Sequence, residues 1–420
     1  MKKKKSKRTL TPKLRFPEFR DKSAWEQRPL GVLTDPITER VGDSDCVPYT
    51  VTSGEGLISQ EEKYGRTIAG KSLKNYYQLK RDDFAFNKSA TKSFPQGYIA
   101  RFQGDERAAV PNSIFTCFRI ADENVDAAYL DYLFQGNLHG RWLKDYITVG
   151  ARAHGALNIS DDDLYALPIP LPAGDETTTE QQKIADCLSS LDGLIAAEGR
   201  MLEALRDHKR GLMQQLFPQP GQTQPCLRFP EFRDKGEWKM KKLGEVAAFL
   251  NGRAYKKEEL LERGKYRVLR VGNFFTNENW YFSDLELDET KYCDNGDLLY
   301  AWSASFGPRI WEGERVIYHY HIWKVVENQG IDKSFLFTCL GRETEKMKAE
   351  SANGAAMLHI TKGTIESWDC GIPSVAEQQK IAACLTALDT QLAAQAAKID
   401  SLKTHKRGLM QQLFPAPEEQ

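Results

Sequence analysis

The sequence has no long hydrophobic run and no excess of charge of either sign. No window approaches 18 uninterrupted apolar residues, so we expect no segment that spans a bilayer and no membrane partner. The 58 basic residues are balanced by 58 acidic residues, and therefore no long-range field of one sign draws the whole molecule onto a polyanion. Any surface that binds nucleic acid must be local.

Cysteine is sparse and scattered along the chain. The 8 cysteines form no Cys-x-x-Cys pair of the kind that binds zinc, and they are too few to build a disulfide scaffold for 420 residues. The basic segment Met1–Arg8 leads into a polar stretch and lacks the apolar core of a secretory signal. We therefore expect a cytoplasmic protein with reduced thiols, divided into two to four folded units.

Motifs of catalysis are missing or misplaced. There is no Gly-x-Ser-x-Gly elbow, no glycine-rich dinucleotide fingerprint and no Asn-Pro-Pro-Tyr-like tetrad for amino methylation. Gly65–Ser72 matches the phosphate-loop pattern, but polar residues precede it where a working loop follows a buried strand. His319 and His321 are placed on one side of an expected strand, and no third metal ligand is signalled. We expect no catalytic residue, no metal site and no cofactor in this chain.

What the sequence does contain is an internal repeat. Leu14–Lys22 returns unchanged at Leu227–Lys235. Two later segments are also duplicated: Glu180–Ala185 as Glu377–Ala382, and His208–Pro218 as His405–Pro415. The residues between these shared segments have largely lost their identity. The order variable, shared, variable, shared predicts two diverged copies of one fold.

The shared tail segments predict two long helices. Thr177-x-x-Glu180 and Ser374-x-x-Glu377 fit a capping box at the helix start, and Pro218 and Pro415 close the far ends. Apolar residues recur between these limits in steps of three and four, as in a coiled-coil seam. The seam residues are Ile184, Leu188, Leu191, Ile195, Leu202, Leu205, Leu212, Ile381, Leu385, Leu388, Leu392, Ile399, Leu402 and Leu409.

Polar residues interrupt this seam and can fix its register: Glu198, Lys209, Gln395 and Lys406. If the first helix leads away from one variable region and the second returns, the two helices lie antiparallel. The alternative is a pair of independent amphipathic helices, each packed on its own domain.

The variable regions alternate short apolar runs with turn signals, which predicts strands with helical additions. Strands are expected within 83–87, 97–102, 113–120, 266–271, 297–302, 309–311 and 321–326, and helices within 127–146 and 334–348. The fold class is therefore α+β, with two strand-rich domains separated by two long helices in an antiparallel coiled coil, related by a pseudo-twofold repeat. The expected parts are a basic tail (1–13), domain 1 (14–173), spacer helix 1 (174–218), domain 2 (219–370), spacer helix 2 (371–415) and a tail (416–420).

Loops of the variable regions carry side chains suited to base edges and phosphates. Lysine and arginine suit guanine and phosphate, asparagine suits adenine, and serine or threonine serves either. Solvated turns remain the alternative for any single one of them. The candidate DNA-binding residues are Lys88, Ser89, Thr91, Lys92, Arg152, Asn273, Trp302, Ser303, Ser305, Arg309, His319 and His321.

These strings resemble the DNA-specificity subunit of Type I restriction-modification systems over nearly the whole chain. The resemblance is carried by the duplicated tail segments, by Asp83–Ser89, by Asp297–Ser303 and by Ser351–Gly354. It implies two target-recognition domains that each read one half of a bipartite site on double-stranded DNA, joined by two helices. It also implies two methylation subunits that bind S-adenosylmethionine and modify adenine, and restriction subunits that use ATP and magnesium.

Two other functions remain open at this point. One is a nucleotide-dependent enzyme built on Gly65–Ser72. The other is a coiled-coil scaffold that contacts only protein and has no DNA specificity.

Overall fold

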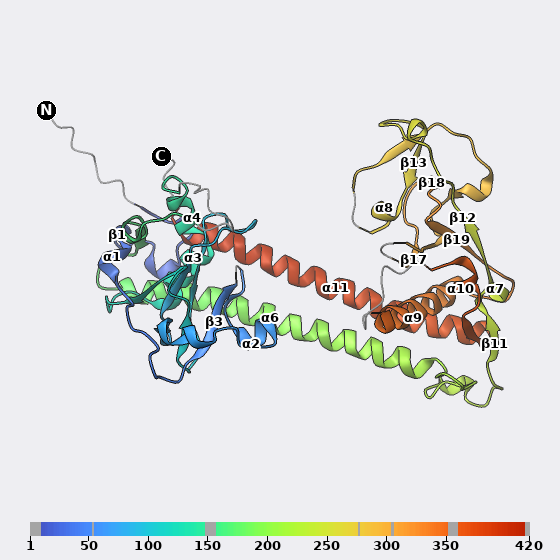
Figure 1. Ribbon diagram of the computed structural model, residues 1–420, viewed down its shortest axis with the longest axis horizontal. Coiled ribbons are helices and arrows are strands. Elements are labelled where there is room, and N and C mark those ends of the chain that lie inside the picture. Colours follow the sequence, from blue (N-terminus) through green and yellow to red (C-terminus); the bar gives the residue numbers. More distant parts are fainter. Residues whose placement is uncertain are drawn as a thin grey trace. The chain divides into compact units, whose positions relative to one another are not determined.

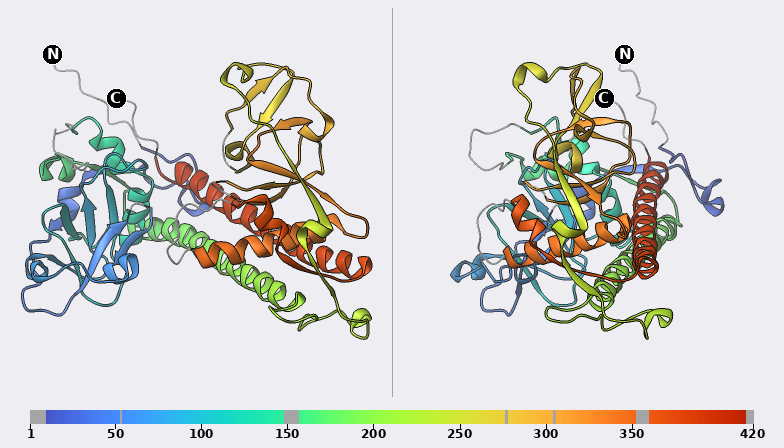
Figure 2. Two further views of the ribbon diagram at one scale, coloured as in Figure 1. Left: turned by 45° about the vertical axis from the view of Figure 1, so that its right-hand side comes forward. Right: turned by 90° about the vertical axis from the view of Figure 1, so that its right-hand side faces the viewer.

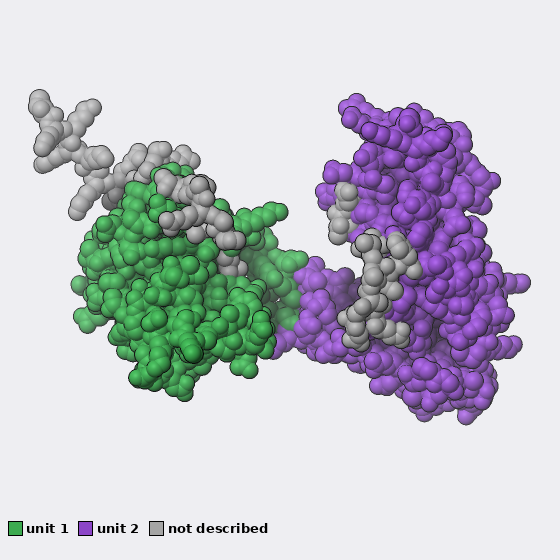
Figure 3. All heavy atoms as spheres, viewed as in Figure 1, with its two compact units in different colours: residues 1–199, 398–420 green, residues 200–397 purple. Residues whose placement is uncertain are grey.

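The computed structural model describes residues 10–52, 54–147, 157–275, 278–303, 306–351 and 360–415. The chain divides into two compact units (Figure 3). Unit 1 comprises residues 1–199 and 398–420, and unit 2 comprises residues 200–397. Unit 1 therefore combines two parts of the chain that are far apart in the sequence. Among the described residues, no helix is long and apolar enough to cross a membrane.

Unit 1 has two four-stranded sheets and a two-stranded ribbon in its described residues. The ribbon pairs β1 with β10, and the sheets have the strand orders β2-β9-β6-β7 and β4-β3-β8-β5. The strands are β1 (Glu26–Pro29), β2 (Thr34–Pro36), β3 (Val47–Thr52), β4 (Gly56–Ser59), β5 (Tyr77–Leu79), β6 (Phe84–Asn87), β7 (Tyr98–Arg101), β8 (Ala108–Val110), β9 (Phe115–Ile120) and β10 (Pro168–Leu171). The helices are α1 (Leu30–Leu33), α2 (Gln60–Tyr64), α3 (Ala127–Gln135), α4 (Leu138–Leu143) and α5 (Asp161–Tyr165).

Unit 2 repeats this topology strand for strand. Its orders are β11-β20, β12-β19-β16-β17 and β14-β13-β18-β15. The strands are β11 (Lys239–Lys242), β12 (Ala247–Asn251), β13 (Tyr266–Leu269), β14 (Tyr281–Ser283), β15 (Tyr292–Cys293), β16 (Leu298–Ala301), β17 (Gly307–Ile310), β18 (Val316–Tyr318), β19 (Ile322–Glu327) and β20 (Asp369–Ile372). The helices are α7 (Leu243–Val246), α8 (Val271–Phe275), α9 (Lys333–Ser351) and α10 (Lys362–Glu366). This confirms the prediction of two diverged copies of one fold.

Alternation along the central strand explains the layers of each unit. Successive strand residues point to opposite faces, so Phe84 and Phe86 of β6 pack with the helices while Ala85 joins the core facing the second sheet. In unit 2, Leu298 and Tyr300 face the helices and Leu299 faces the second sheet in the same way. Each unit is a helix layer, a first sheet and a second sheet (Figures 1 and 2).

Two long helices contribute to both units: α6 (Thr177–Leu216) and α11 (Val375–Leu413). In unit 1, Lys406 Nζ binds Asp192 at 2.7 Å and Lys398 Nζ binds Glu198 at 2.6 Å. Later residues of one helix therefore meet earlier residues of the other, as in an antiparallel pair. In unit 2, the end of α6 packs with the start of α11 in one apolar cluster.

The predicted seam residues all lie on the covered side of these helices. Ile184, Leu188, Ile381, Leu385 and Ile399 are buried, and the other seam residues are half-buried. Leu194 and Met201, which lie off the seam, are 41% and 54% exposed. Of the polar interruptions, Lys209 reaches Asp389 across the pair in unit 2. The antiparallel coiled coil is confirmed, and the alternative of two independent helices is wrong.

The predicted capping boxes are wrong, because the two glutamates have other partners. Glu180 is buried and accepts from Arg15 Nε and Nη2 at 2.7 Å each, and from Trp25 Nε1 at 3.3 Å. The Thr177 hydroxyl donates to the carbonyl of Pro172 at 2.6 Å. In the second copy, one of the two hydrogen bonds of a capping box is present, because Ser374 Oγ accepts from Glu377 N at 3.4 Å.

Unit 2 contains the equivalent of this buried Arg15–Glu180–Trp25 arrangement, and we call each of the two arrangements a joint. Arg228 Nε and Nη2 donate to Glu377 at 2.7 and 2.8 Å, and Trp238 Nε1 donates at 3.3 Å. Each arginine also binds carbonyls at the far end of its own repeated segment, Lys22 and Ser23 for Arg15, and Lys235 and Gly236 for Arg228. The two shared segments are therefore two halves of one buried ion pair, which accounts for their joint retention.

Both joints also take in the end of the opposite long helix. Leu14 N donates to Gln412 O of α11 in unit 1, and Leu227 N donates to Gln215 O of α6 in unit 2, both at 2.9 Å. Phe414 packs edge-on against Tyr129 with ring centroids 5.5 Å apart. The last turns of each long helix thus complete the core of the unit in which they end.

Candidate nucleic-acid interface

In unit 1, four of the predicted DNA-binding residues share one loop that leaves β6. The loop spans residues 88–97, between β6 and β7, and contains Lys88, Ser89, Thr91 and Lys92. Its backbone is fixed locally, because Thr91 Oγ1 accepts from Phe94 N at 3.1 Å and Phe94 packs on Tyr98. Lys92 is exposed on this turn. Arg152 lies outside the described residues.

Lys88 is held more firmly than a solvated loop lysine. Its Nζ binds Asp161 Oδ1 at 2.7 Å, and the Thr116 hydroxyl donates to the same oxygen at 2.8 Å. Burial opposes the charge on Asp161, but these two hydrogen bonds outweigh it and hold the pKa of Asp161 below its ordinary value. Lys88 therefore has a partner within the protein, and any DNA contact must compete with Asp161.

In unit 2, three of the predicted residues meet where two strands of the first sheet end. Trp302 follows β16, and its backbone N–H donates to His321 O at 3.1 Å just before β19. Trp302 Nε1 donates to Tyr320 O at 2.8 Å. The prediction that His319 and His321 lie on a strand is wrong, because residues 319–321 form a tight turn between β18 and β19 that is closed by Ile322 N donating to His319 O at 2.9 Å.

Trp302 and Lys88 occupy the same position in the two copies. Lys88 N donates to Ile114 O at 3.1 Å, as Trp302 N does to His321 O. The carbonyl of Lys88 accepts from Leu157 N, and the carbonyl of Trp302 accepts from Ile360 N. One backbone position therefore presents an ammonium group in unit 1 and an indole in unit 2.

The remaining predicted residues of unit 2 are divided between two places. Ser303 follows Trp302 and is buried. Asn273 lies within α8, and its Nδ2 donates to Asn279 O at 2.8 Å. Arg309 of β17 contacts the same helix, because its Nη1 donates to the carbonyl of Phe274. Ser305 lies outside the described residues. The role of all these side chains in binding DNA stays a prediction.

Sequence reasoning missed the residues that surround the turn. Tyr255 stacks on His319 with ring centroids 6.3 Å apart, and the guanidinium of Arg253 lies 5.2 Å from the Tyr255 ring centroid. Arg270 lies over Tyr281 at 4.2 Å. The available signal was Arg253-Ala-Tyr255-Lys256, a short segment with basic and aromatic residues just after β12. Nothing in the sequence indicates that this segment flanks the turn.

Burial and charge keep one imidazole of this turn neutral. The pKa of His319 is lowered to about 4, first by burial and then by the neighbouring His321 and Arg270. His319 is therefore uncharged near pH 7, and its ring is available for stacking rather than for an ion pair.

Gly252 follows the end of β12 and allows the chain to pass close to the turn at 319–321. A Cβ atom at this position would lie 2.4 Å from His319 O and 2.5 Å from Tyr318 O. Gly252 N donates to Ile322 O, and the next residue, Arg253, donates to Tyr318 O and accepts from Tyr320 N. The absence of a side chain at Gly252 is what places Tyr255 beside His319.

We expect Gly252→Ala to lower the free energy of unfolding of unit 2 by about 1–3 kcal/mol, because backbone atoms must move to make room. The measurement is urea unfolding followed by circular dichroism. Gly363→Ala in α10 is the control, since no atom lies within 4 Å of the new Cβ, and it should be neutral or stabilising by up to about 1 kcal/mol. Equal effects of the two changes would contradict the close approach.

The segment Gly65–Ser72 does not have the local structure of a phosphate loop. Gly65 ends the short helix α2 in the left-handed conformation, at φ 66°, and no buried strand leads into it. Lys71 begins a 3-10 helix over Lys71–Asn75, and the backbone N–H groups of Ile68 and Ala69 are bound by the Gln60 side chain. This geometry does not support the nucleotide-dependent alternative.

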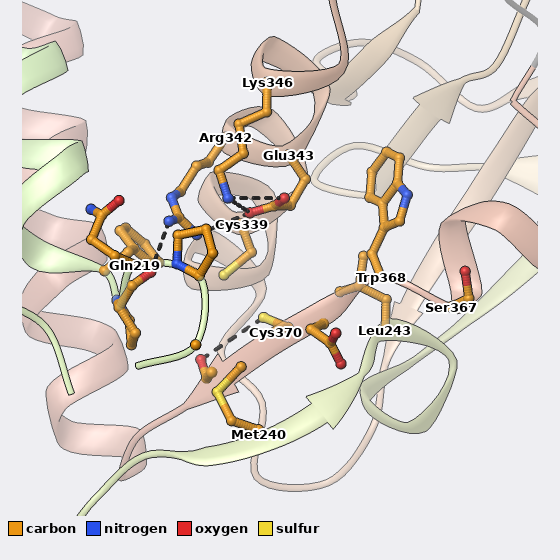
Figure 4. A pocket seen from close by; sticks show the side chains of 16 residues that line it. Gln219, Met240, Leu243, Cys339, Arg342, Glu343, Lys346, Ser367, Trp368 and Cys370 are labelled. Carbon is orange, nitrogen blue, oxygen red and sulfur yellow. Dashed lines mark hydrogen bonds and ion pairs between the residues drawn. The ribbon is translucent and has the colours of Figure 1, made fainter. Parts of the chain in front are cut away.

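A pocket of about 410 Å³ lies where the end of α6 meets α9 and β20 of unit 2 (Figure 4). Arg342 and Lys346 enter it from α9, and both are paired with Glu343. Arg342 also donates to Pro218 O at 2.9 Å, which ties α9 to the chain that leaves α6. The pocket is therefore part of the contact between α9 and the end of α6.

Within the described ranges, no group of three or more His, Cys, Asp or Glu side chains could hold a metal, and all eight cysteines are free thiols.

A family model describing the Type I restriction modification DNA specificity domain matches residues 56–206 and 235–404. The chain belongs to this specificity family. The first range contains β6, β7 and β9 of the first sheet of unit 1 and most of α6, and the second contains all four first-sheet strands of unit 2 and most of α11. The family is one of recognition rather than of catalysis, and this chain is therefore a specificity subunit.

Curated relatives of this chain are specificity subunits as well. The chain is 23% identical over 406 residues to a putative type I restriction enzyme MjaX specificity subunit from Methanocaldococcus jannaschii, covering 93% of this chain and 92% of that protein. It is 25% identical over 265 residues to the MjaVIII specificity subunit from the same organism, covering 59% of this chain and 61% of that protein.

Solved structures share the fold of the specificity subunit. A Type I restriction-modification S subunit from M. genitalium has a TM-score of 0.55 at 16% identity, covering 97% of this chain and all of that one. A chain from a structure of complex assembly and conformational transition of the type I R-M system has a TM-score of 0.60 at 17% identity, covering 93% and 98%.

Proposed function

We propose that this specificity subunit reads a bipartite target on double-stranded DNA, with unit 1 on one half and unit 2 on the other. The observation that carries the proposal is the equivalence of Lys88 and Trp302. Two copies of one fold present different side chains from the same backbone position, which is what two readers of different sequences need. Lysine suits guanine and phosphate, whereas the indole of Trp302, whose single N–H donates to Tyr320 O, offers a flat apolar ring.

The helices α6 and α11 set the gap between the two half-sites. A continuous, paired seam makes a stiff spacer, and at about 1.5 Å per residue some 40 residues extend roughly 60 Å. Readers held at a fixed separation select half-sites about one helical turn, roughly 10 base pairs, apart. Changing the length of the spacer should change the gap and leave both half-site sequences as they are.

The partners are two methylation subunits and the restriction subunits of the same system. S-adenosylmethionine, ATP and magnesium belong to those subunits, and this chain contributes recognition. Because the chain has balanced charge, part of the binding to phosphates is supplied by the methylation subunits. The exposed faces of α6 and α11 serve as their docking surface.

The test is to map adenine methylation across the genome of cells that contain this chain and its partner subunits. The expected result is one split motif, with two defined halves and an unspecified gap. Deletion of this chain should remove methylation at that motif. A continuous motif, or an unchanged methylation map after deletion, would contradict the proposal. Absence of sequence-dependent DNA binding, even with the partner subunits supplied, would favour the scaffold alternative.

A further inference from the structure

The rings around the turn at 319–321 form one connected aromatic cluster, made of Tyr255, Trp302, His319, Tyr320 and His321. Tyr320 lies 3.9 Å from His321 and 4.5 Å from His319, between ring centroids. Trp302 contacts His321 edge-on at 4.9 Å. Core packing does not account for all of these rings on one surface turn, because Tyr320 is 39% exposed.

The cluster is anchored at its inner end and open at its outer end. Trp302 stacks on Trp323 at 5.8 Å, and Trp323 stacks on the buried Tyr300 at 6.0 Å. The indole N–H of Trp302 holds the carbonyl of Tyr320. The exposed ring is therefore supported by a rigid column of rings that ends in the core.

Cations flank this column. Arg270 lies near His319 and over Tyr281, and Arg253 lies over Tyr255 with its guanidinium paired to Glu259 at 2.7 Å, so a phosphate at Arg253 must compete with that carboxylate. Flat rings bordered by guanidinium groups are the combination that binds a nucleobase face together with its backbone phosphate. In an intact duplex both faces of each base are covered by neighbouring bases, so such a surface can stack only on a base that has left the helix.

We propose that Tyr320, supported by His321 and Trp302, forms a stacking platform for one unstacked base within the half-site that unit 2 reads. This inference rests on the proposed function. It applies to unit 2 alone, because the equivalent turn of unit 1 is Pro111-Asn-Ser-Ile114 and carries no aromatic residue. The two half-sites are thus bound differently, one as a paired duplex and the other with a local opening.

The test uses the full-length chain, with its methylation partners, and duplexes that carry the mapped motif. A single unpaired thymine is placed at each position of each half-site in turn, and affinity is measured by fluorescence anisotropy. At one position of the half read by unit 2, affinity should rise about tenfold, because the cost of unstacking has been removed. No position of the other half should show such a gain.

The variant Tyr320→Ala should abolish the gain and weaken binding to the fully paired motif, while that motif is still preferred over a scrambled duplex because unit 1 reads its own half. The matched control is Tyr64→Ala, which removes a 50% exposed tyrosine from unit 1 and should leave the gain intact. As a second measurement, 5-iododeoxyuridine at the responsive position should crosslink on irradiation to the peptide that contains Tyr320.

The outcomes separate this inference from the proposed function. If the paired motif is bound specifically but no unpaired position raises affinity, or if the gain survives in Tyr320→Ala, the platform is refuted and the proposed function stands. If Tyr320→Ala no longer prefers the fully paired motif over a scrambled duplex, Tyr320 reads bases within the intact duplex, and the platform is also refuted. If the paired motif binds no better than a scrambled duplex, the proposed function fails, and the inference fails with it.

Discussion

Glu377→Gln should lower the free energy of unfolding of unit 2 by about 3–5 kcal/mol. The substitution keeps the shape of the side chain but leaves the guanidinium of Arg228 buried without a counter-charge, and breaking a buried pair from one side is strongly destabilising. Both side chains are almost inaccessible, with 7% and 1% of their surface exposed. Urea unfolding of the whole chain, with hydrogen exchange at β11 and β20 to report on unit 2, measures the loss.

The chain supplies a matched control between the same two segments. Lys380 binds Glu231 at 3.3 Å, and about half of each side chain is exposed. Lys380→Ala should change stability by less than about 1 kcal/mol, as is usual for surface pairs. The double variant Arg228→Met with Glu377→Leu should recover much of the loss, because an apolar pair needs no counter-charge. An equal effect of Glu377→Gln and Lys380→Ala would show that burial of the joint is unimportant.

Lengthening both spacer helices by three heptads should move the two half-sites apart by about one turn of DNA. Three heptads add 21 residues and, at about 1.5 Å per residue, roughly 32 Å, close to the 34–36 Å repeat of the duplex. The insertions belong beside Glu198 in α6 and beside Lys398 in α11, which are ion-paired across the coil. Methylation mapping should then return the same two half-sites with a gap longer by about 9–10 base pairs.

Two further insertion variants test this spacer more sharply. One heptad in each helix keeps the seam but adds only about 10 Å, which turns the half-sites away from each other around the duplex, so specific methylation should fall strongly. Three heptads in α6 alone break the register of the seam and should abolish assembly of the pair. Retention of the original gap in the symmetric three-heptad variant would refute the spacer as the determinant of the gap.

The sequence was sufficient for the helices and for the duplication, because both depend on regular spacing. Steps of three and four place Ile184, Leu188 and Leu191 on one side of a helix whatever else the chain does, and that side is covered in the structure. Strands such as β6 and β16 were also predicted, since each is a run of apolar residues between turn signals. The short, mixed strands β4, β5 and β15 gave no comparable pattern.

Predictions that depended on a distant partner were the ones that failed. The spacing of Thr177 and Glu180 fits a capping box, but the partner of Glu180 is Arg15, 165 residues away, and no local pattern reveals it. Lys88 has the sequence context of a solvated loop lysine, but its Nζ is bound by Asp161, 73 residues away. The alternation of Tyr318 to His321 has the period of a strand, yet the close approach of Gly252 fixes these last residues as a turn.

The division of unit 1 between the two ends of the chain has a consequence for its synthesis. Its strands emerge from the ribosome first, but Leu413 and Phe414, which are buried against Tyr129 and its neighbours, are made only after the whole of unit 2. Domains generally fold as they are made, starting from the N-terminus. Here the domain that starts first must wait with part of its apolar core uncovered, so a nascent chain stalled before α11 ends should expose unit 1, and not unit 2, to chaperones and proteases.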